Sequence, residues 1–256
     1  MQIQMIEQFR QKISSGPVYG PFMKSCDPAF VESAGYAGFD FAILDMEHGP
    51  VSTESMQNNI RAAEVAGLLP IIRVSGISES EISKALDIGA LGVEVPQVTT
   101  AEAARSVVQA ARFYPEGMRG VCRFVRAAGY SSVDRQQYFK MANQALIVVQ
   151  LEGQEALANI DEIMLVSGID VLFIGPYDLS QSLGVPGQTT HPRVIEAMEE
   201  IVAKAAGCGR IVGTFTDSRE TLAKWKSCGV RYLSYSVDVG IFYEACKGIV
   251  GMARSL

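Results

Sequence analysis

The chain has 256 residues, of which 48% are hydrophobic, and this length suits one large core of the size found in single α/β barrels. Its 22 basic and 28 acidic side chains give a net charge of −6, and no segment combines clustered Lys and Arg with aromatic residues, so we expect no nucleic-acid partner. No apolar run approaches the roughly 18 residues needed to span a bilayer, and residues 1–13 lack the apolar core of a secretory signal, so we expect a cytoplasmic protein with no membrane partner.

Eight short apolar segments with the character of buried strands recur along the chain. They are PVYGPFM (17–23), FDFAILDM (39–46), LPIIRV (69–74), LGVEVP (91–96), LIVVQLE (146–152), DVLFIG (170–175), RIVGTF (210–215) and RYLSYSV (231–237). Apolar strands that alternate with helices are typical of a parallel sheet covered on both faces. Eight such units, with no G-x-G-x-x-G after any strand, favour one (β/α)₈ TIM barrel domain over residues 1–256 rather than an open dinucleotide-binding sheet.

Helix starts are indicated between these segments where a capping side chain precedes an acidic residue by three positions. The pairs are Ser78 with Glu81, Thr99 with Glu102, and Asp217 with Glu220. Glycines stand where helices are expected to end before the next strand, because glycine adopts a left-handed backbone easily. These glycines are Gly67, Gly89, Gly168 and Gly229.

One unit is irregular, because residues 112–145 form a long insertion between the fourth and fifth strands. We expect this insertion to lie over the mouth of the barrel, where it could act as a lid or a subunit contact. The five cysteines are widely spaced and contain no C-x-x-C pair. Buried free thiols are therefore expected rather than disulfides or a thiolate zinc site.

Polar residues follow several of the expected strands, and barrel enzymes build their sites where the carboxyl ends of the strands meet. The residues placed on that face are Lys24, Asp45, Glu47, His48, Arg73, Gln150, Glu152 and Asp178. Glu152 and Asp178 supply carboxylates from neighbouring strand ends, with no thiolate or second histidine nearby, which suits Mg²⁺ or Mn²⁺ rather than zinc. Alternatively, Glu152 is an ion-paired strand end and Asp178 caps the following helix.

The segment around His48 suggests proton transfer. Asp45 precedes His48 by three residues and could orient one ring nitrogen while the other faces substrate, although a structural histidine fits the spacing equally well. Glu47 could point across the strand or reach metal-bound water. Arg73 ends an apolar strand, so its guanidinium either pairs with one of these acids or binds an anionic substrate. His191, in THPRV, is expected at the start of a helix without a chemical role.

Four longer stretches carry a family resemblance. They are AGFDFAILDMEHGP (37–50), ALDIGALGVEVPQVTTAEAARSVVQAARFYPEGMRGV (85–121), QLEGQEALANIDEI (150–163) and GIDVLFIGPYDLSQSLGVPG (168–187). Together they resemble the class II pyruvate-dependent aldolases of the HpcH/HpaI family, from about Gly16 to Asp238. The resemblance implies a barrel of the phosphoenolpyruvate/pyruvate type that reversibly cleaves a 4-hydroxy-2-oxo acid to pyruvate and an aldehyde. It also implies a hexamer, built as a trimer of dimers that exchange the last helix.

The resemblance also implies a divalent metal, Mg²⁺, Mn²⁺ or Co²⁺. Glu152 and Asp178 would bind it together with two oxygens of pyruvate. Glu47, and Asp87 from a neighbouring subunit, would hold metal-bound waters. Gln150 would line the pyruvate pocket.

The remaining implied roles concern the bond that breaks. Arg73 would hold the developing enolate oxygen, and His48 with Asp45 would move the proton of the aldol hydroxyl. Arg126, in the insertion, would reach across a subunit interface toward the aldehyde. Tyr177, in GPYDL, fills a position that is usually small in this family and would line the substrate pocket.

Three other functions remain open from the residues alone. A Schiff-base aldolase could use Lys24, which follows the first strand where the family commonly has a small residue. A non-catalytic protein could retain the metal and 2-oxo acid site, with Tyr177 blocking the aldehyde. A decarboxylase or another carbon–carbon lyase could use the same enolate.

Overall fold

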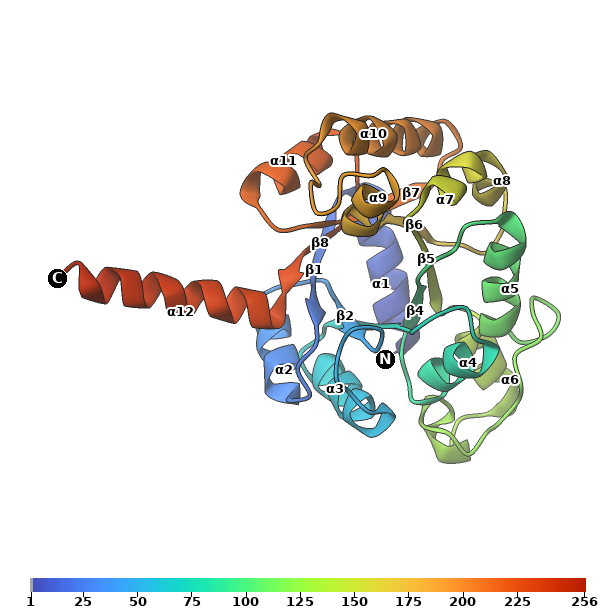
Figure 1. The fold of residues 1–256 in the computed structure, drawn as a ribbon. Helices are drawn as coiled ribbons and strands as arrows, with labels where there is room; N and C mark the ends of the chain where they lie inside the picture. The colour runs from blue at the N-terminus through green and yellow to red at the C-terminus, as the bar shows by residue number, and fades with distance from the viewer. Residues whose placement is uncertain (1) are drawn as a thin grey trace.

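Eight parallel strands pair in chain order and close into a barrel when the last strand pairs with the first (Figure 1). The strands are β1 (Val18–Met23), β2 (Phe41–Asp45), β3 (Leu69–Arg73), β4 (Gly92–Val95), β5 (Leu146–Leu151), β6 (Val171–Ile174), β7 (Ile211–Thr216) and β8 (Tyr232–Val237). This computed structural model describes residues 2–256. It confirms the (β/α)₈ TIM barrel and all eight expected strands.

Helices surround the barrel and cover the strands from outside. Those between strands are α2 (Pro28–Tyr36), α3 (Thr53–Val65), α4 (Glu79–Asp87), α5 (Ala101–Ala111), α7 (Gln154–Ala158), α8 (Ile160–Met164), α9 (Pro176–Ser182), α10 (Pro192–Gly207) and α11 (Arg219–Ser227). Ser78 caps α4 as predicted, but Thr100 and Ser218 cap α5 and α11, one residue later than the pattern indicated. The four glycines expected at helix ends all have positive φ.

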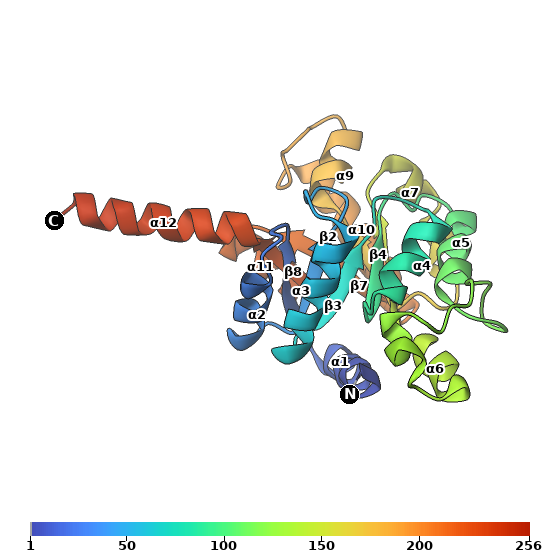
Figure 2. The ribbon, with the colours of Figure 1, turned by 90° about the horizontal axis from the view of Figure 1, so that it is seen from below.

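The N-terminal helix α1 (Gln2–Ser15) was not anticipated from the sequence. Its Ile6, Phe9 and Ile13 are buried in the same cluster as the side chains inside the barrel. The Phe9 ring meets that of Phe41, at the start of β2, edge to face with centroids 5.9 Å apart. Helix α1 therefore closes the barrel at the end where the strands begin, opposite α9 (Figure 2).

The insertion contains a 3₁₀ segment, η1 (Arg126–Ser131), and helix α6 (Arg135–Ala142). Its Tyr138 and Ala142 line a small cavity together with Ile6 of α1, so the insertion lies beside α1 at the end where the strands begin. The expectation that it covers the barrel mouth is wrong. The physical reason is topological: the segment joins the end of α5 to the start of β5, and such connections lie at the N-terminal ends of the strands.

The last helix, α12 (Asp238–Arg254), extends away from the barrel in both views of the molecule. Asp238 is the buried residue of this helix. Large apolar side chains are exposed along it, namely Val239, Ile241, Phe242, Tyr243, Ile249, Val250 and Met252. Within residues 2–256, no helix is long and apolar enough to cross a membrane. The cysteines are free, as expected, but none is buried, so that part of the expectation is wrong.

Candidate active site at the carboxyl ends of the strands

A pocket of about 320 Å³ opens where the strands end. Its wall includes six of the residues that the sequence placed on this face or in the substrate pocket: Lys24, His48, Arg73, Gln150, Tyr177 and Asp178. They come from the ends of strands that are far apart in the sequence and from the loops or helices that follow them. The barrel therefore brings these chemical groups around one space.

Asp45 and Arg73 form a bidentate ion pair at the wall of this pocket. They end β2 and β3 and stand opposite each other in the strand register. Arg73 donates from Nε to Asp45 Oδ1 at 2.9 Å and from Nη2 to Oδ2 at 2.8 Å, and its Nη1 lies 3.0 Å from Glu47 Oε2. The Arg73 guanidinium also lies over the Phe22 ring, 4.6 Å from its centroid. A planar cation is thus immobilised at the pocket wall.

Burial disfavours the charged forms of Asp45 and Arg73, but the attraction between the two groups outweighs this effect. Burial alone would raise the pKa of Asp45, whereas the hydrogen bonds and charge of Arg73 outweigh this and hold that pKa below its usual value. Burial would likewise lower the pKa of Arg73, but Asp45 raises it above its usual value. Both groups are therefore charged at neutral pH.

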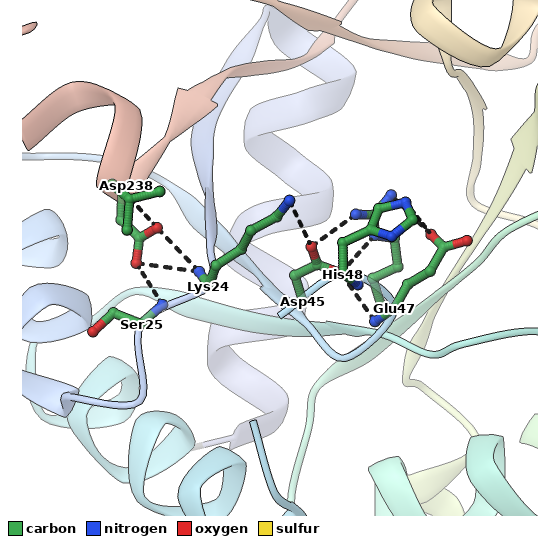
Figure 3. Close-up of polar contacts among 8 residues, drawn as sticks. Lys24, Ser25, Asp45, Glu47, His48 and Asp238 are labelled. Carbon is green, nitrogen blue, oxygen red and sulfur yellow. Dashed lines mark hydrogen bonds and ion pairs between the residues drawn. The ribbon is translucent and has the colours of Figure 1, made fainter. Parts of the chain in front are cut away.

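The predicted contact between Asp45 and a ring nitrogen of His48 is wrong. Asp45 Oδ1 instead accepts the backbone N–H groups of Glu47 and His48, at 3.1 and 3.2 Å (Figure 3). The ring of His48 faces Glu47, with Nε2 3.9 Å from Glu47 Oε2, and the His48 side chain is 59% exposed. Arg73, on the neighbouring strand, forms hydrogen bonds with both oxygens of the Asp45 carboxylate. Asp45 therefore positions His48 by binding the backbone N–H of the histidine and not its ring.

Glu47 lies between Arg73 and His48. Its side chain is 12% exposed, and burial raises the pKa of Glu47 although Arg73 and His48 oppose this shift. The carboxylate thus contacts both the fixed cation and the histidine. The loop after β2 places His48 at the pocket wall, with Glu47 beside its ring.

Glu152 follows β5 and is held by two hydrogen bonds, from the backbone N–H of Gln97 and the side-chain amide of Gln150. Burial, with the nearby charges of Asp178 and Glu47, raises the pKa of Glu152 to about 7 despite these hydrogen bonds. A half-buried carboxylate whose pKa is raised in part by neighbouring carboxylates marks a site at which a cation is favoured. The residues present therefore fit a divalent metal with oxygen ligands.

Gly175 makes room for this arrangement. A Cβ at position 175 would lie 3.0 Å from Glu152 Oε2 and 3.3 Å from Gln150 Nε2. Glu152 accepts its hydrogen bonds from neutral amides, and the residue that caps α9 is Gly175, without a side-chain bond. Neither alternative role proposed for Glu152 and Asp178 is therefore observed among residues 2–256. No group of three or more His, Cys, Asp or Glu in the described chain could hold a metal by itself. A metal at Glu152 and Asp178 would need oxygens from water and substrate.

Tyr177 forms one wall of the pocket. Its hydroxyl donates to Asp217, its ring meets Phe215 edge to face at 5.9 Å, and the residue is 46% exposed. The hydrogen bond to Asp217 raises the pKa of Tyr177 to about 12. Asp217, expected to cap a helix, instead ties the tyrosine to the loop after β7.

Two predicted site residues lie at the opposite end of the barrel. Arg126 pairs with Glu64 and lies 3.4 Å from the carbonyl oxygen of Ile88, and Asp87 pairs with Arg119. Within one chain neither lines the pocket. The roles assigned to Arg126 and Asp87 therefore depend on a neighbouring subunit.

Two residues near the site were missed by the sequence analysis. Glu94 is fully buried on β4, where Tyr232 donates to its Oε2 at 3.4 Å, and burial raises the pKa of Glu94 to about 8. Asp238, at the start of α12, is 5% exposed and binds the loop after β1. The sequence feature that could have pointed to Glu94 is its position as the single acidic residue within the apolar segment LGVEVP.

A parallel barrel whose strand ends gather an immobilised arginine, a histidine and acidic residues around one pocket defines an enzyme that stabilises developing negative charge. The HpcH/HpaI aldolase/citrate lyase family matches residues 19–245, and the chain belongs to that family. This confirms the resemblance inferred from the sequence.

Known relatives agree with this assignment. The chain is 34% identical over 247 residues to a hydroxypyruvate/pyruvate aldolase from Roseobacter denitrificans, covering 95% of this chain and 96% of the relative. It is also 34% identical to a 2-keto-3-deoxy-L-rhamnonate aldolase from Salmonella gallinarum, covering 97% and 93%. The crystal structure of an HpcH/HpaI aldolase from Desulfitobacterium hafniense superposes with a TM-score of 0.89 at 30% identity, covering 96% of each chain. The expected class, a carbon–carbon lyase, is confirmed.

Proposed function

We propose that this protein is a divalent-metal-dependent aldolase that reversibly cleaves a 4-hydroxy-2-oxo acid to pyruvate and an aldehyde. The observation that carries the proposal is the arrangement of Glu152 and Asp178 beside the fixed cation of Arg73. Asp178 and Arg73 line the pocket together with Gln150, whose amide binds the half-buried Glu152, and burial together with the charge of Asp178 raises the pKa of Glu152 to about 7. The names of the two aldolase relatives support the same chemistry.

Glu152 and Asp178 would hold Mg²⁺, Mn²⁺ or Co²⁺, with Gln150 beside them at the pyruvate end of the pocket. A divalent cation bound there would polarise the 2-oxo group of the substrate and stabilise the enolate by several kcal/mol. Glu47, and Asp87 of a neighbouring subunit, would hold water molecules on the other side of the cation.

Arg73 would bind the oxygen on which negative charge develops when the C3–C4 bond breaks. Asp45 and Glu47 hold its guanidinium in place before substrate arrives. A charge that is already oriented needs no reorganisation in the transition state, which is why such groups are effective. The low exposure of the Arg73 side chain, 8%, strengthens its field inside the pocket.

His48 would accept the proton of the 4-hydroxyl as the aldehyde forms. Its ring is exposed at the pocket wall, and its backbone is held by Asp45. The Glu47 carboxylate beside Nε2 stabilises the imidazolium produced by this transfer. In the synthetic direction the same imidazolium would return the proton to the new hydroxyl.

A homo-oligomer is part of the proposal. The apolar side chains exposed along α12 support exchange of this helix between subunits, in a hexamer built as a trimer of dimers. Light scattering after chromatography measures the assembly directly. Phe242→Asp together with Ile249→Asp should reduce the mass toward that of one chain, and an unchanged mass would reject α12 as the interface.

Chelation tests the metal requirement. EDTA should abolish pyruvate release from 4-hydroxy-2-oxo acids, and added Mg²⁺, Mn²⁺ or Co²⁺ should restore it. Calorimetric titration with Mn²⁺ should show binding lost in Glu152→Gln but retained in Glu155→Gln, which changes an exposed acid three residues away. Aldol cleavage that persists after complete chelation would refute the proposal.

The alternatives separate in the same assays. A pocket of about 320 Å³ remains beside Tyr177, so this ring is a wall and does not support the non-catalytic alternative. Activation of a Schiff-base lysine requires apolar surroundings or a neighbouring cation, whereas Lys24 faces Asp45 with Nζ 3.7 Å from Oδ2. Borohydride with pyruvate should therefore not label Lys24. A decarboxylase restricted to oxaloacetate would turn over no aldol.

A further inference from the structure

Lys24 occupies the side of the pocket away from the expected metal. It follows β1, and in a ring of eight strands in chain order β1 lies opposite β5, which carries Glu152. His48 follows β2, the neighbour of β1, and Arg73 ends β3. Around the mouth, the order from the carboxylate pair is therefore Arg73, then His48, then Lys24.

The ammonium group of Lys24 has unused hydrogen-bonding capacity. Its nearest acidic atom is Asp45 Oδ2 at 3.7 Å, beyond hydrogen-bonding distance (Figure 3). Asp45 already accepts two bonds from Arg73 and two from backbone N–H groups. Within residues 2–256 no hydrogen bond of Lys24 Nζ is formed, and its side chain is 29% exposed. Three donors thus remain available at the pocket.

The backbone of Lys24 is clamped although its ammonium group is not. Asp238 accepts the backbone N–H of Lys24 at 3.1 Å with both carboxylate oxygens, and that of Ser25 at 2.8 Å. Asp238 is itself 5% exposed. These bonds fix the point of the pocket wall from which the Lys24 side chain extends.

Apolar groups form part of the wall of the pocket that Lys24 lines. Phe22, Phe215 and Val237 line the pocket together with the ring of Tyr177. Apolar walls displace water and reduce the screening of a charge. An anionic group in this part of the pocket would interact with Lys24 more strongly than at an open surface.

We propose that Lys24 binds an anionic group, a carboxylate or a phosphate, carried by the acceptor aldehyde. This inference rests on the proposed aldolase function. In that function pyruvate lies at Glu152, and the new carbon–carbon bond joins it to the aldehyde in the part of the pocket that Arg73 and His48 line. The far end of an acceptor that reacts beside His48 then reaches the end of β1. The two anions place the same demand on the ammonium group, so the assay includes both.

The test compares matched acceptors in the aldol addition with pyruvate and Mn²⁺. Glyoxylate is paired with glycolaldehyde, and glyceraldehyde 3-phosphate with glyceraldehyde, so that each pair differs in the anionic group. The measured quantity is the ratio of kcat/KM for the anionic acceptor to that for its neutral partner. Comparing this ratio between variants cancels the intrinsic reactivity of each aldehyde.

The Lys24→Met substitution should lower the ratio by about tenfold or more for the preferred anion, the scale of one charged hydrogen bond. Lys24→Arg keeps the charge and should retain most of the preference. Lys226→Met removes the same charge from the exposed surface of α11 and should leave the ratio unchanged. The acceptor pair whose ratio falls in Lys24→Met shows whether Lys24 prefers a carboxylate or a phosphate.

The outcomes separate this inference from the aldolase proposal. If the wild type, Lys24→Met and Lys24→Arg all catalyse aldol addition with the same ratio of kcat/KM for anionic over neutral acceptors, the role of Lys24 is overturned. The aldolase function then remains intact. Absence of turnover with all four aldehydes in the metal-loaded wild type would remove both. A ratio that falls in Lys24→Met and recovers in Lys24→Arg supports the inference.

Discussion

Asp238 binds the backbone N–H of Lys24 with both of its carboxylate oxygens, each at 3.1 Å, across 214 residues of sequence. Asp238 is the first residue of α12, and Lys24 is one of the cations at the pocket wall, together with Arg73. The start of the projecting helix and the loop after β1 are therefore held together by one buried carboxylate. Any shift at the base of α12 would be transmitted to Lys24.

Replacing Asp238 with Asn should loosen this loop, because a neutral amide oxygen is a weaker acceptor than a carboxylate. We expect KM for anionic aldehydes to rise about three- to tenfold, with kcat for oxaloacetate decarboxylation much less affected. The Glu220→Gln variant, which changes an exposed acid in the first turn of α11, is the control. A KM that stays at the wild-type value would show that Asp238 has no positioning role.

Replacing His48 with Ala should lower aldol cleavage by about 10²–10⁴-fold, the usual contribution of a positioned general base. Oxaloacetate decarboxylation should continue, because it requires the enolate but no proton transfer at a 4-hydroxyl. His191 is the other of the two histidines and caps α10, so His191→Ala is the matched control. Normal aldol cleavage by His48→Ala would exclude the histidine as the base.

Glu94 should make the folded state less stable as the pH rises. Its folded-state pKa is about 8 against an ordinary value of 4.5, so the folded protein retains a proton that the unfolded chain has lost between these values. The free energy of unfolding therefore falls as the pH rises from about 4.5 to about 8.

The Glu94→Gln variant should remove this dependence. Its Tm should exceed that of the wild type near pH 8 by about 2–4 °C for each kcal/mol regained, and the two should converge near pH 5. Glu155→Gln, at an exposed site, serves as the control in scanning calorimetry. Parallel Tm curves for the wild type and Glu94→Gln over this range would contradict the buried neutral carboxyl.

Tyr177 should ionise more readily when its acceptor is neutral. The hydrogen bond to Asp217 raises the pKa of Tyr177 to about 12, so Asp217→Asn should bring it back toward the usual value of 10.0. A difference titration in the ultraviolet should then show one more tyrosine ionising below about pH 11 than in the wild type. Identical titration curves would place the Tyr177 hydroxyl away from Asp217.

The sequence by itself determined the barrel and the face on which the site lies. Strand character is a local property, because apolar runs such as LPIIRV and DVLFIG report their burial within a few residues. The last residue of each run then lies on the active face in any closed parallel barrel. For this reason His48, Arg73 and Asp178 could be assigned to one pocket before their contacts were known.

Only the tertiary structure decided which of these groups interact. Asp45 had two candidate partners, His48 three residues away and Arg73 28 residues away, and strand register placed the guanidinium in the plane of the carboxylate. Segments that are distant in the chain likewise decide three other features. These are the position of the insertion, the packing of α1 against the barrel, and the hydrogen bonds between Asp238 and the backbone of Lys24. A local sequence pattern indicates which interactions a residue can form. Its actual partner is decided by competition among the groups that folding brings next to it, including groups that are distant in the chain.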